Sequence, residues 1–190
     1  MFPIEAFQRT LGKAIDIFRQ LGIRFHLTGG VAAVYYAEPR LTQDIDIVID
    51  NAQTQATLAE LLKRLEGSDF LFDAESVRRA VISRGMFQLL DRRESLKLDI
   101  YPRELIPGEL NRSVEQEVFE GTMIPIASRV DTVVSKLVWA SKGSSKSRRD
   151  VRHMFRQAPE EDRQLIKHFS DQLGLSRLLQ EILTEQEEID

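Results

Sequence analysis

The chain has 190 residues, of which 42% are hydrophobic and 29% charged, with no cysteine and a formal net charge of −4. This composition suits one compact core with a small helical addition, and it excludes disulfides, thiolate nucleophiles and sulfur-ligated zinc. An acidic balance argues against indiscriminate coating of nucleic acid, and the lack of a secretory signal or of an apolar run of about 18 residues predicts a cytoplasmic protein that does not use a membrane.

Residues 1–102 alternate between predicted helices and strands. Apolar steps of three or four residues indicate helices, and strict alternation indicates strands. In chain order these elements are a helix over 4–21, a strand over 23–28, a helix over 31–37, a strand over 43–50, a helix over 52–66, a short strand over 70–72, a helix over 75–82 and a β-hairpin of 86–90 with 96–101.

The remainder of the chain is mainly helical. One more strand is expected over 121–126, kept at a sheet edge by Pro125. Helices follow over 128–141, 148–157, 160–173 and 175–188, separated by short breaks. The expected fold class is α+β: a mixed β-sheet flanked by helices in a domain of residues 1–127, followed by a helical region of residues 128–190.

Two carboxylates share one face of the predicted strand 43–50. Side chains alternate along a strand, so Asp44 and Asp46 point the same way while Ile45 and Ile47 enter the core. Adjacent carboxylates repel each other when ionised and need a cation or strong hydrogen-bond donors nearby, and a divalent metal is the economical solution. Oxygen ligands favour Mg²⁺ or Mn²⁺, and these aspartates are therefore candidate metal ligands.

A third carboxylate has the same setting in the second strand of the hairpin. Leu98 and Ile100 face inward there, so Asp99 projects outward, as Asp44 and Asp46 do. If the two strands are neighbours, three carboxylates converge, enough to hold two metal ions about 4 Å apart that activate a hydroxyl and stabilise a leaving pyrophosphate. The alternative is that these aspartates are solvated residues on an exposed sheet face.

The pair Gly29-Gly30 lies between a strand and a helix. Glycine allows the backbone to approach a ligand closely, and N–H groups at a helix start bind anions. Thr28 adds a hydroxyl at the same turn. The chain has neither a P-loop nor a dinucleotide-binding glycine fingerprint, and a purely structural turn is the alternative.

Together these motifs resemble the DNA polymerase β-like nucleotidyltransferase superfamily, and most of all its minimal members, which include the abortive-infection toxin-type (AbiEii-like) enzymes. The resemblance spans about residues 22–152, and it departs from the subgroup after Asp150, where an acidic continuation is often seen. The residues that carry it are Gly29-Gly30, Arg40-x-Thr42-x-Asp44-x-Asp46, Asp99, Asp131, Lys136 and Arg148-Arg149-Asp150.

The resemblance implies a nucleotidyltransferase-type sheet and roles for individual residues. Asp44, Asp46 and Asp99 would bind two Mg²⁺ or Mn²⁺ ions, and Asp99 is also the candidate general base. The residues expected to contact the nucleotide are Thr28, Gly29, Gly30, Arg40, Thr42, Lys136, Arg148 and Arg149. For Arg40, pairing with a neighbouring acid is an equal alternative, and Lys136 has the alternative of an ordinary surface lysine.

These residues predict an enzyme that moves an NMP from an NTP to a hydroxyl acceptor and releases pyrophosphate. The acceptor could be tRNA or a protein, and a basic segment from Lys142 to Arg152 slightly favours tRNA. A toxin role would add an antitoxin partner. The alternatives are a non-catalytic nucleotide- or protein-binding relative and an antibiotic-modifying nucleotidyltransferase that recognises a cationic drug through Asp69, Asp73 and Glu75. Trp139 is interpreted as packing in the core or between the two parts of the chain, with base stacking as the alternative, and His26 as structural.

Overall fold

A seven-stranded mixed sheet forms the framework of the protein in a computed structural model, which describes residues 4–37 and 45–185. The strand order is β3-β4-β5-β2-β1-β7-β6, with β2 parallel to β5 and antiparallel to β1. The strands are β1 (Phe25–Thr28), β2 (Ile45–Ile49), β3 (Phe70–Leu71), β4 (Phe87–Asp91), β5 (Leu96–Tyr101), β6 (Val114–Phe119) and β7 (Thr122–Ile126). The predicted α+β class is confirmed.

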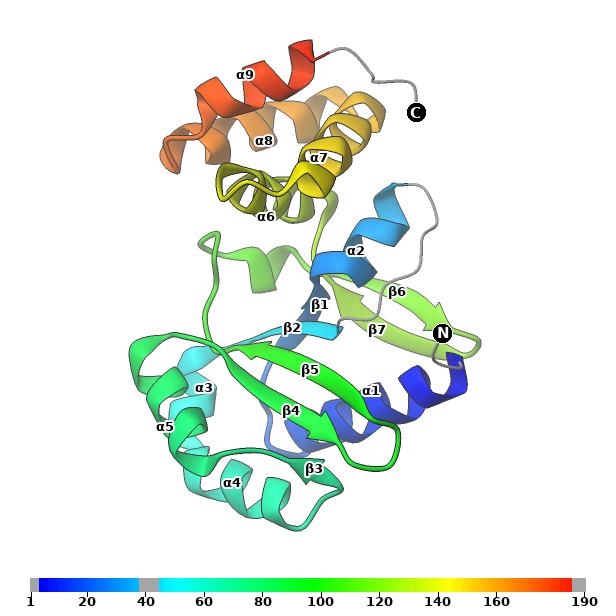
Figure 1. The fold of residues 1–190 in the computed structure, drawn as a ribbon, viewed down its shortest axis with the longest axis vertical. Coiled ribbons are helices and arrows are strands. Elements are labelled where there is room, and N and C mark those ends of the chain that lie inside the picture. The colour runs from blue at the N-terminus through cyan, green and yellow to red at the C-terminus, as the bar shows by residue number, and fades with distance from the viewer. Residues whose placement is uncertain (1–3, 38–44, 186–190) are drawn as a thin grey trace.

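The helices fall into two groups in space (Figure 1). Helices α6–α9 stack at one end of the molecule, and α1 and α3–α5 lie with the sheet at the other end. The helices are α1 (Ile4–Gln20), α2 (Gly29–Tyr36), α3 (Asn51–Ala56), α4 (Leu58–Glu66), α5 (Ala74–Ser83), α6 (Arg129–Ser141), α7 (Ser145–Gln157), α8 (Glu160–Gln172) and α9 (Ser176–Thr184), with a 3₁₀ helix η1 (Glu109–Arg112). Within the described residues, none of these helices is long and apolar enough to cross a membrane.

Buried apolar residues form two clusters. One joins the inward-facing side of the sheet to α1, α4 and α5, where side chains such as Leu98 and Ile100 are fully buried. The other joins α6–α9. Tyr36 of α2 packs against both clusters, and Ile106 of the β5–β6 connection belongs to the second. The helical part is therefore packed onto the α/β part.

Strand β6 was not predicted from the sequence. Among the described strands it pairs with β7 alone, at the edge of the sheet. It carries the exposed residues Glu115 and Glu117, so it lacks the hydrophobic run that marks a strand. Its presence makes the expected edge position of Pro125 wrong, because β7 lies between β1 and β6. Strand β7 pairs with β1 at one register position, Leu27 with Ile126. Pro125, which has no backbone N–H to donate, is therefore tolerated inside the sheet.

The single helix expected over 52–66 is two helices, α3 and α4, which meet at Thr57. The hydroxyl of Thr54 donates to the Asp50 carbonyl at 2.6 Å, and that of Thr57 donates to the Gln53 carbonyl at 2.8 Å. Threonine hydroxyls that bond to backbone carbonyls compete with regular helix bonding. The other predicted helices and strands are present with shifted ends. Residues 43–44 of the predicted strand 43–50 and residues 186–188 of the predicted helix 175–188 lie outside the described residues.

Candidate active site

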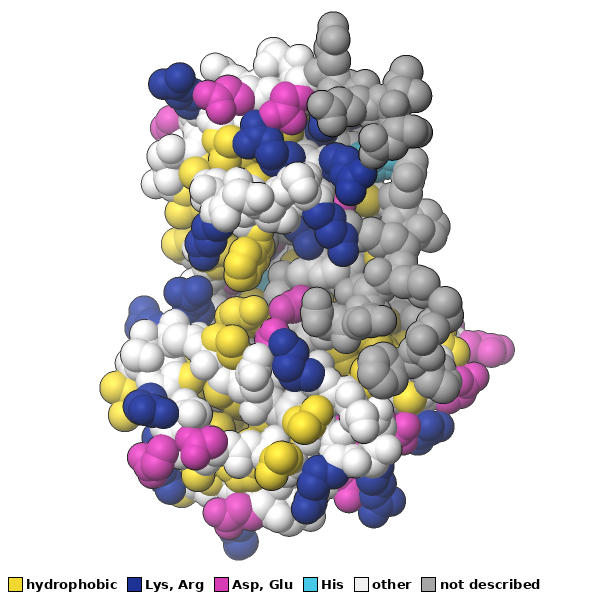
Figure 2. Space-filling model, in the orientation of Figure 1, with side chains coloured by type: hydrophobic (Ala, Val, Ile, Leu, Met, Phe, Trp, Pro, Cys, Tyr) yellow, Lys and Arg dark blue, Asp and Glu magenta, His cyan; other side chains and the backbone are white. Residues whose placement is uncertain are grey.

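A cavity of about 340 Å³ opens between the sheet and helices α6 and α7. The sheet side contributes the β1–α2 turn and the outward-facing residues of β2 and β5. The helical side contributes one face of α6 and the start of α7. In Figure 2, Lys and Arg side chains cover parts of the helical half of the face drawn. The polar and charged lining residues include Thr28, Asp46, Lys97, Asp99, Tyr101, Arg103, Glu109, Ser135, Lys136, Lys142, Ser144, Lys146 and Ser147.

Asp46 and Asp99 are direct neighbours in the sheet. They are register partners in the parallel pair β2–β5, and both line the cavity. Asp46 is also the register partner of Thr28 in β1, which places the β1–α2 turn beside the carboxylates. Strand alternation therefore brings together residues that are more than 50 positions apart in sequence. Asp44, Arg40 and Thr42 lie outside the described residues.

Gly29 is fitted to the carboxylate of Asp46. A Cβ at position 29 would lie 2.0 Å from Asp46 Oδ2, which is an impossible contact. Gly29 also has φ +62°, the left-handed region that glycine adopts without strain. Helix α2 begins at Gly29 itself, two residues before the predicted start. This glycine is thus required both for the turn and for the close approach of Asp46.

Neighbouring side chains hold the two aspartates. The hydroxyl of Tyr101 donates to Asp46 Oδ1 at 3.3 Å, and burial together with the nearby carboxylates raises the pKa of Tyr101. Asp99 accepts from Gln88 Nε2 at 2.9 Å and forms an ion pair with Lys97 at 3.1 Å. Sequence reasoning missed these three residues, although the hairpin register gives Gln88 as the partner of Asp99 and alternation puts Lys97 and Tyr101 on the same face.

The helical wall of the cavity carries cations and an aromatic ring. Lys136 lies 3.7 Å from Asp150 of α7 and is largely buried, whereas Trp139 is 46% exposed. A core position for Trp139 is wrong, because its indole lines the cavity and is not part of the second cluster. Packing of the ring between the two parts of the chain stays a prediction. The Lys142 ammonium lies 4.7 Å from the centroid of the indole. Lys146, at the start of α7, also lines the cavity.

The arginines of α7 lie elsewhere. Arg148 forms an ion pair with Glu185, and Arg152 bonds to the carbonyl of the same residue at 3.1 Å. Neither Arg148 nor the exposed Arg149 is among the lining residues. A role for this arginine pair in binding the nucleotide stays a prediction of the family resemblance.

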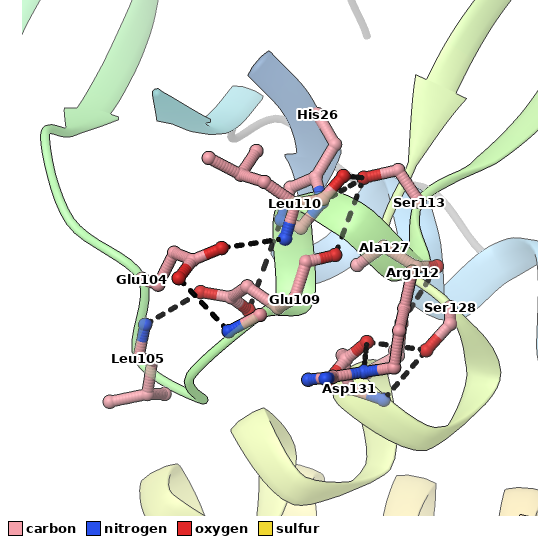
Figure 3. A network of polar contacts seen from close by, with 12 residues as sticks. His26, Glu104, Leu105, Glu109, Leu110, Arg112, Ser113, Ala127, Ser128 and Asp131 are labelled. Atoms are coloured by element: carbon pink, nitrogen blue, oxygen red, sulfur yellow. Dashed lines mark hydrogen bonds and ion pairs between the residues drawn. The ribbon is translucent and has the colours of Figure 1, made fainter. Parts of the chain in front are cut away.

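A polar network beside the cavity ties the β5–β6 connection to α6 (Figure 3). The carboxylate of Asp131 is fully buried, accepts from the Arg112 guanidinium at 2.7 Å and also accepts from the Ser128 hydroxyl at 2.6 Å. Ser128 in turn caps α6 by accepting from the Asp131 N–H at 3.1 Å. Asp131, one of the residues of the family-like motif, is held in this ion pair and does not line the cavity.

Glu109 and His26 form the buried end of the same network. Glu109 accepts from the Leu105 N–H at 2.6 Å, and burial raises its pKa to about 7. His26 Nδ1 lies 2.8 Å from the Ser113 hydroxyl and Nε2 lies 3.9 Å from Glu109 Oε2. Burial, reinforced by the charge of Arg112, lowers the pKa of His26 to about 4. These shifts keep both buried groups neutral over a wide pH range, and a structural role of His26 remains the interpretation.

The carboxylates of the cavity supply part of the ligand set that a hard divalent cation requires. Asp46 and Asp99 present carboxylate oxygens on one face, the ligand chemistry that Mg²⁺ and Mn²⁺ prefer. Over residues 4–37 and 45–185, no group of three or more potential metal-ligating side chains converges. The third predicted ligand, Asp44, is outside those ranges. The residues that can be placed fit the metal as two of its ligands.

Solved structures with a similar fold include proteins described as nucleotidyltransferases or nucleotidyltransferase-like. The antibiotic-resistance factor ANT(2″)-Ia is 14% identical, with a TM-score of 0.60, over 95% of this chain and 99% of that one. A putative nucleotidyltransferase from Thermotoga maritima is 18% identical, with a TM-score of 0.52, over 78% and 93%. An antigenic nucleotidyltransferase-like protein from Paracoccidioides brasiliensis is 17% identical, with a TM-score of 0.51, over 95% and 94%. At these identities the likeness shows the fold.

The family is shown by sequence. Residues 15–188 match the family described as nucleotidyl transferase AbiEii toxin, type IV toxin–antitoxin system. The chain belongs to this family and is a nucleotidyltransferase. None of the curated proteins matches it in sequence. The resemblance drawn from the Gly-Gly turn and the aspartates is confirmed at the level of family and fold.

Proposed function

We propose that the protein transfers an NMP from an NTP to a hydroxyl acceptor and releases pyrophosphate. The observation that carries this proposal is the cavity itself, in which Asp46 and Asp99 stand side by side opposite a wall that bears Lys136. Carboxylates on one side and cations on the other are what a metal-bound polyphosphate needs.

Asp46 and Asp99, together with Asp44, would hold Mg²⁺ or Mn²⁺, two ions by family resemblance. When bound, such ions neutralise phosphate charge and favour ionisation of a hydroxyl. Gln88 and Tyr101 keep the two carboxylates oriented through their hydrogen bonds. This preorganisation is the chain's own contribution, because the reaction rests on positioning and electrostatics more than on covalent chemistry.

The phosphates would lie over the β1–α2 turn. Backbone N–H groups at the start of α2 bind anions, and the Thr28 hydroxyl and Lys136 add to that field. Arg40, Thr42, Arg148 and Arg149 are further nucleotide contacts by resemblance alone. The acceptor oxygen bonds to the α-phosphorus as the bond from that phosphorus to the bridging oxygen breaks. The acceptor proton passes to Asp99, and pyrophosphate leaves.

The charge of the cavity supports an anionic acceptor, and among the acceptors considered this is tRNA rather than a protein hydroxyl. The cationic lining residues are Lys97, Arg103, Lys136, Lys142 and Lys146, and the acidic ones are Asp46, Asp99 and the buried Glu109. An antibiotic such as tobramycin, whose adenylyl product is bound in a structure of ANT(2″)-Ia, is cationic and suits this wall poorly. The three acids suggested for such a drug have other partners: Asp69 pairs with Lys13 and Arg93, Asp73 caps α5, and Glu75 pairs with Arg78.

By its family, the protein would act as the toxin of a toxin–antitoxin pair, with an antitoxin as partner. NTPs and tRNA are cytoplasmic molecules, and the cytoplasm is the proposed compartment. In the proposed domain organisation, residues 1–127 form the catalytic domain, and residues 128–190 form a helical region that carries the basic wall of the cavity. The two hydrophobic clusters support this division, except that Ile106 belongs to the helical cluster and Tyr36 packs against both.

The test is transfer of label from each of four α-³²P-labelled NTPs, with Mg²⁺ or Mn²⁺, to total tRNA or to cell lysate. Wild type is compared with Asp46→Asn and with Asp16→Asn, the same change at an exposed position of α1. We expect label on RNA with wild type and Asp16→Asn, and none with Asp46→Asn. Circular dichroism of all three proteins checks that each is folded.

Each outcome separates the alternatives. Transfer by Asp46→Asn at the wild-type rate would refute the proposed site. Binding of NTP without release of pyrophosphate in any condition would favour the non-catalytic relative. Label on protein in the lysate, with none on tRNA, would keep the chemistry and change the acceptor.

A further inference from the structure

The helical wall of the cavity contains an apolar strip that phosphate binding does not use. Val138 and Trp139 of α6 line the cavity, and Leu105 of the β5–β6 connection lines it as well. The indole is 46% exposed, so a large aromatic surface is available in a cavity that is otherwise rich in charge. Exposed aromatic faces of this kind bind planar ring systems by stacking.

The order of side chains along α6 relates this strip to the phosphate site. Lys136, Trp139 and Lys142 are spaced by three residues and all line the cavity. At a rise of about 1.5 Å per residue, Lys136 and Lys142 are about 9 Å apart along the helix axis, with the indole between them. Lys136 is largely buried beside Asp150, whereas Lys142 is exposed. The wall therefore runs from a deep cation to an aromatic ring nearer the solvent.

We infer that Trp139 is the platform on which the nucleobase of the incoming NTP stacks. This inference rests on the proposed use of an NTP and adds the base subsite to it. With the phosphates at the β1–α2 turn and Lys136, the base extends along α6 toward Trp139. The Lys142 ammonium lies over one face of the indole, 4.7 Å from its centroid, so the base stacks on the opposite face. Stacking accepts any base, so this subsite binds all four NTPs through their ring faces.

Trp139 is the chain's only tryptophan, so its fluorescence reports on this position alone. In the experiment, the full-length protein is titrated in the presence of Mg²⁺ and in the absence of acceptor. The ligands are each NTP and inorganic tripolyphosphate, which carries the negative charge of the triphosphate and lacks the base. Calorimetry measures binding of both. We expect NTPs to quench the fluorescence and tripolyphosphate to bind without comparable quenching.

Two variants test the energetic contribution. Trp139→Leu is expected to weaken NTP binding roughly 5- to 100-fold while leaving tripolyphosphate binding unchanged, and Trp139→Phe is expected to retain most of the affinity. Equal quenching by tripolyphosphate, or NTP binding that Trp139→Leu does not weaken, would overturn the base platform while leaving nucleotidyl transfer intact. Quenching that requires added tRNA would assign the ring to the acceptor instead and also overturn it. Absence of NTP binding by calorimetry would overturn both the platform and the proposed function.

Discussion

The carboxylate of Asp46 packs directly against the backbone of Gly29, at a distance that admits no side chain at position 29. A Cβ there would lie 2.0 Å from Asp46 Oδ2. The turn that would receive the phosphates and the carboxylate that would hold the metal are therefore one unit, built from β1 and β2 at the register pair of Thr28 and Asp46.

Gly29→Ala is expected to abolish transfer, because the new methyl group must displace the Asp46 carboxylate. Gly22→Ala is the matched control: Gly22 has φ +65°, close to the +62° of Gly29, and open space where its Cβ would be. Both substitutions should cost about 1 kcal/mol of stability from backbone strain. Urea unfolding and label transfer measure the two effects, and only Gly29→Ala should lose activity. Full activity in Gly29→Ala would show that the position of Asp46 does not matter.

Lys136→Met is expected to lower transfer about 10- to 100-fold, mainly through a higher KM for NTP. The side chain lines the cavity, where a charge-assisted hydrogen bond to phosphate is strong. Arg149→Gln removes a cation from the exposed, non-lining side of α7 and should have a smaller effect. Steady-state kinetics of the two variants with the same NTP give the comparison, and urea unfolding checks that Lys136→Met, which removes the ion-pair partner of the buried Asp150, is folded. A larger loss in Arg149→Gln would mean that the acceptor or nucleotide reaches a surface outside the cavity.

Much of the catalytic side of the cavity could be predicted from the sequence because it depends on local rules. Strand alternation puts Asp46 and Asp99 on one face, and a Gly-Gly turn after a strand indicates a close approach of the backbone. Alternation does not show which strands are neighbours. The adjacency of Asp46 and Asp99 needed the sheet order, which places β5 beside β2.

The helical side of the cavity was less predictable. The apolar stripe of α6 accounts for its buried face, but it does not say which residues of the other face meet the sheet. The exposure of Trp139 depends on the position of α6 across the cavity from β2 and β5. The ion pair of Arg112 with Asp131 joins α6 to the connection that contains η1. Strand β6 was missed for a related reason, because an edge strand with exposed glutamates has no buried pattern of its own.

Asp131→Ala is expected to destabilise the protein by about 3 kcal/mol, since it removes a fully buried carboxylate from its ion pair with the partly exposed Arg112. The variant also loses the contact between Asp131 and the Ser128 hydroxyl at the start of α6. Urea unfolding measures the change, and Arg112→Met in the same background should recover part of it. If Asp131→Ala loses transfer with wild-type stability, Asp131 acts on the nucleotide rather than on the fold.

The raised pKa of Glu109 makes stability depend on pH in a defined direction. Burial raises this pKa from 4.5 to about 7, so the folded protein keeps a proton that the unfolded chain has already lost. The stabilising effect of that proton is complete below pH 4.5 and is lost as the pH rises through 7. The lowered pKa of His26, about 4, acts in the opposite sense. The neutral His26 contributes to the stability of the folded protein above pH 6.5, and this contribution is lost as the pH falls from 6.5 through 4. Between pH 4.5 and 6.5, a rise in pH therefore lowers the free energy of unfolding through Glu109 and raises it through His26.

Glu109→Gln isolates the carboxyl group, because the variant stays neutral at every pH while His26 is present in both proteins. The free energy of unfolding of Glu109→Gln, relative to wild type, should increase by about 3 kcal/mol between pH 4.5 and pH 8, the value that corresponds to a rise in pKa from 4.5 to about 7. Urea unfolding at half-unit pH intervals gives this difference curve. A curve that is flat over this range would mean that Glu109 ionises in the folded protein as it does in the unfolded chain, and that the network beside the cavity carries a charge at neutral pH.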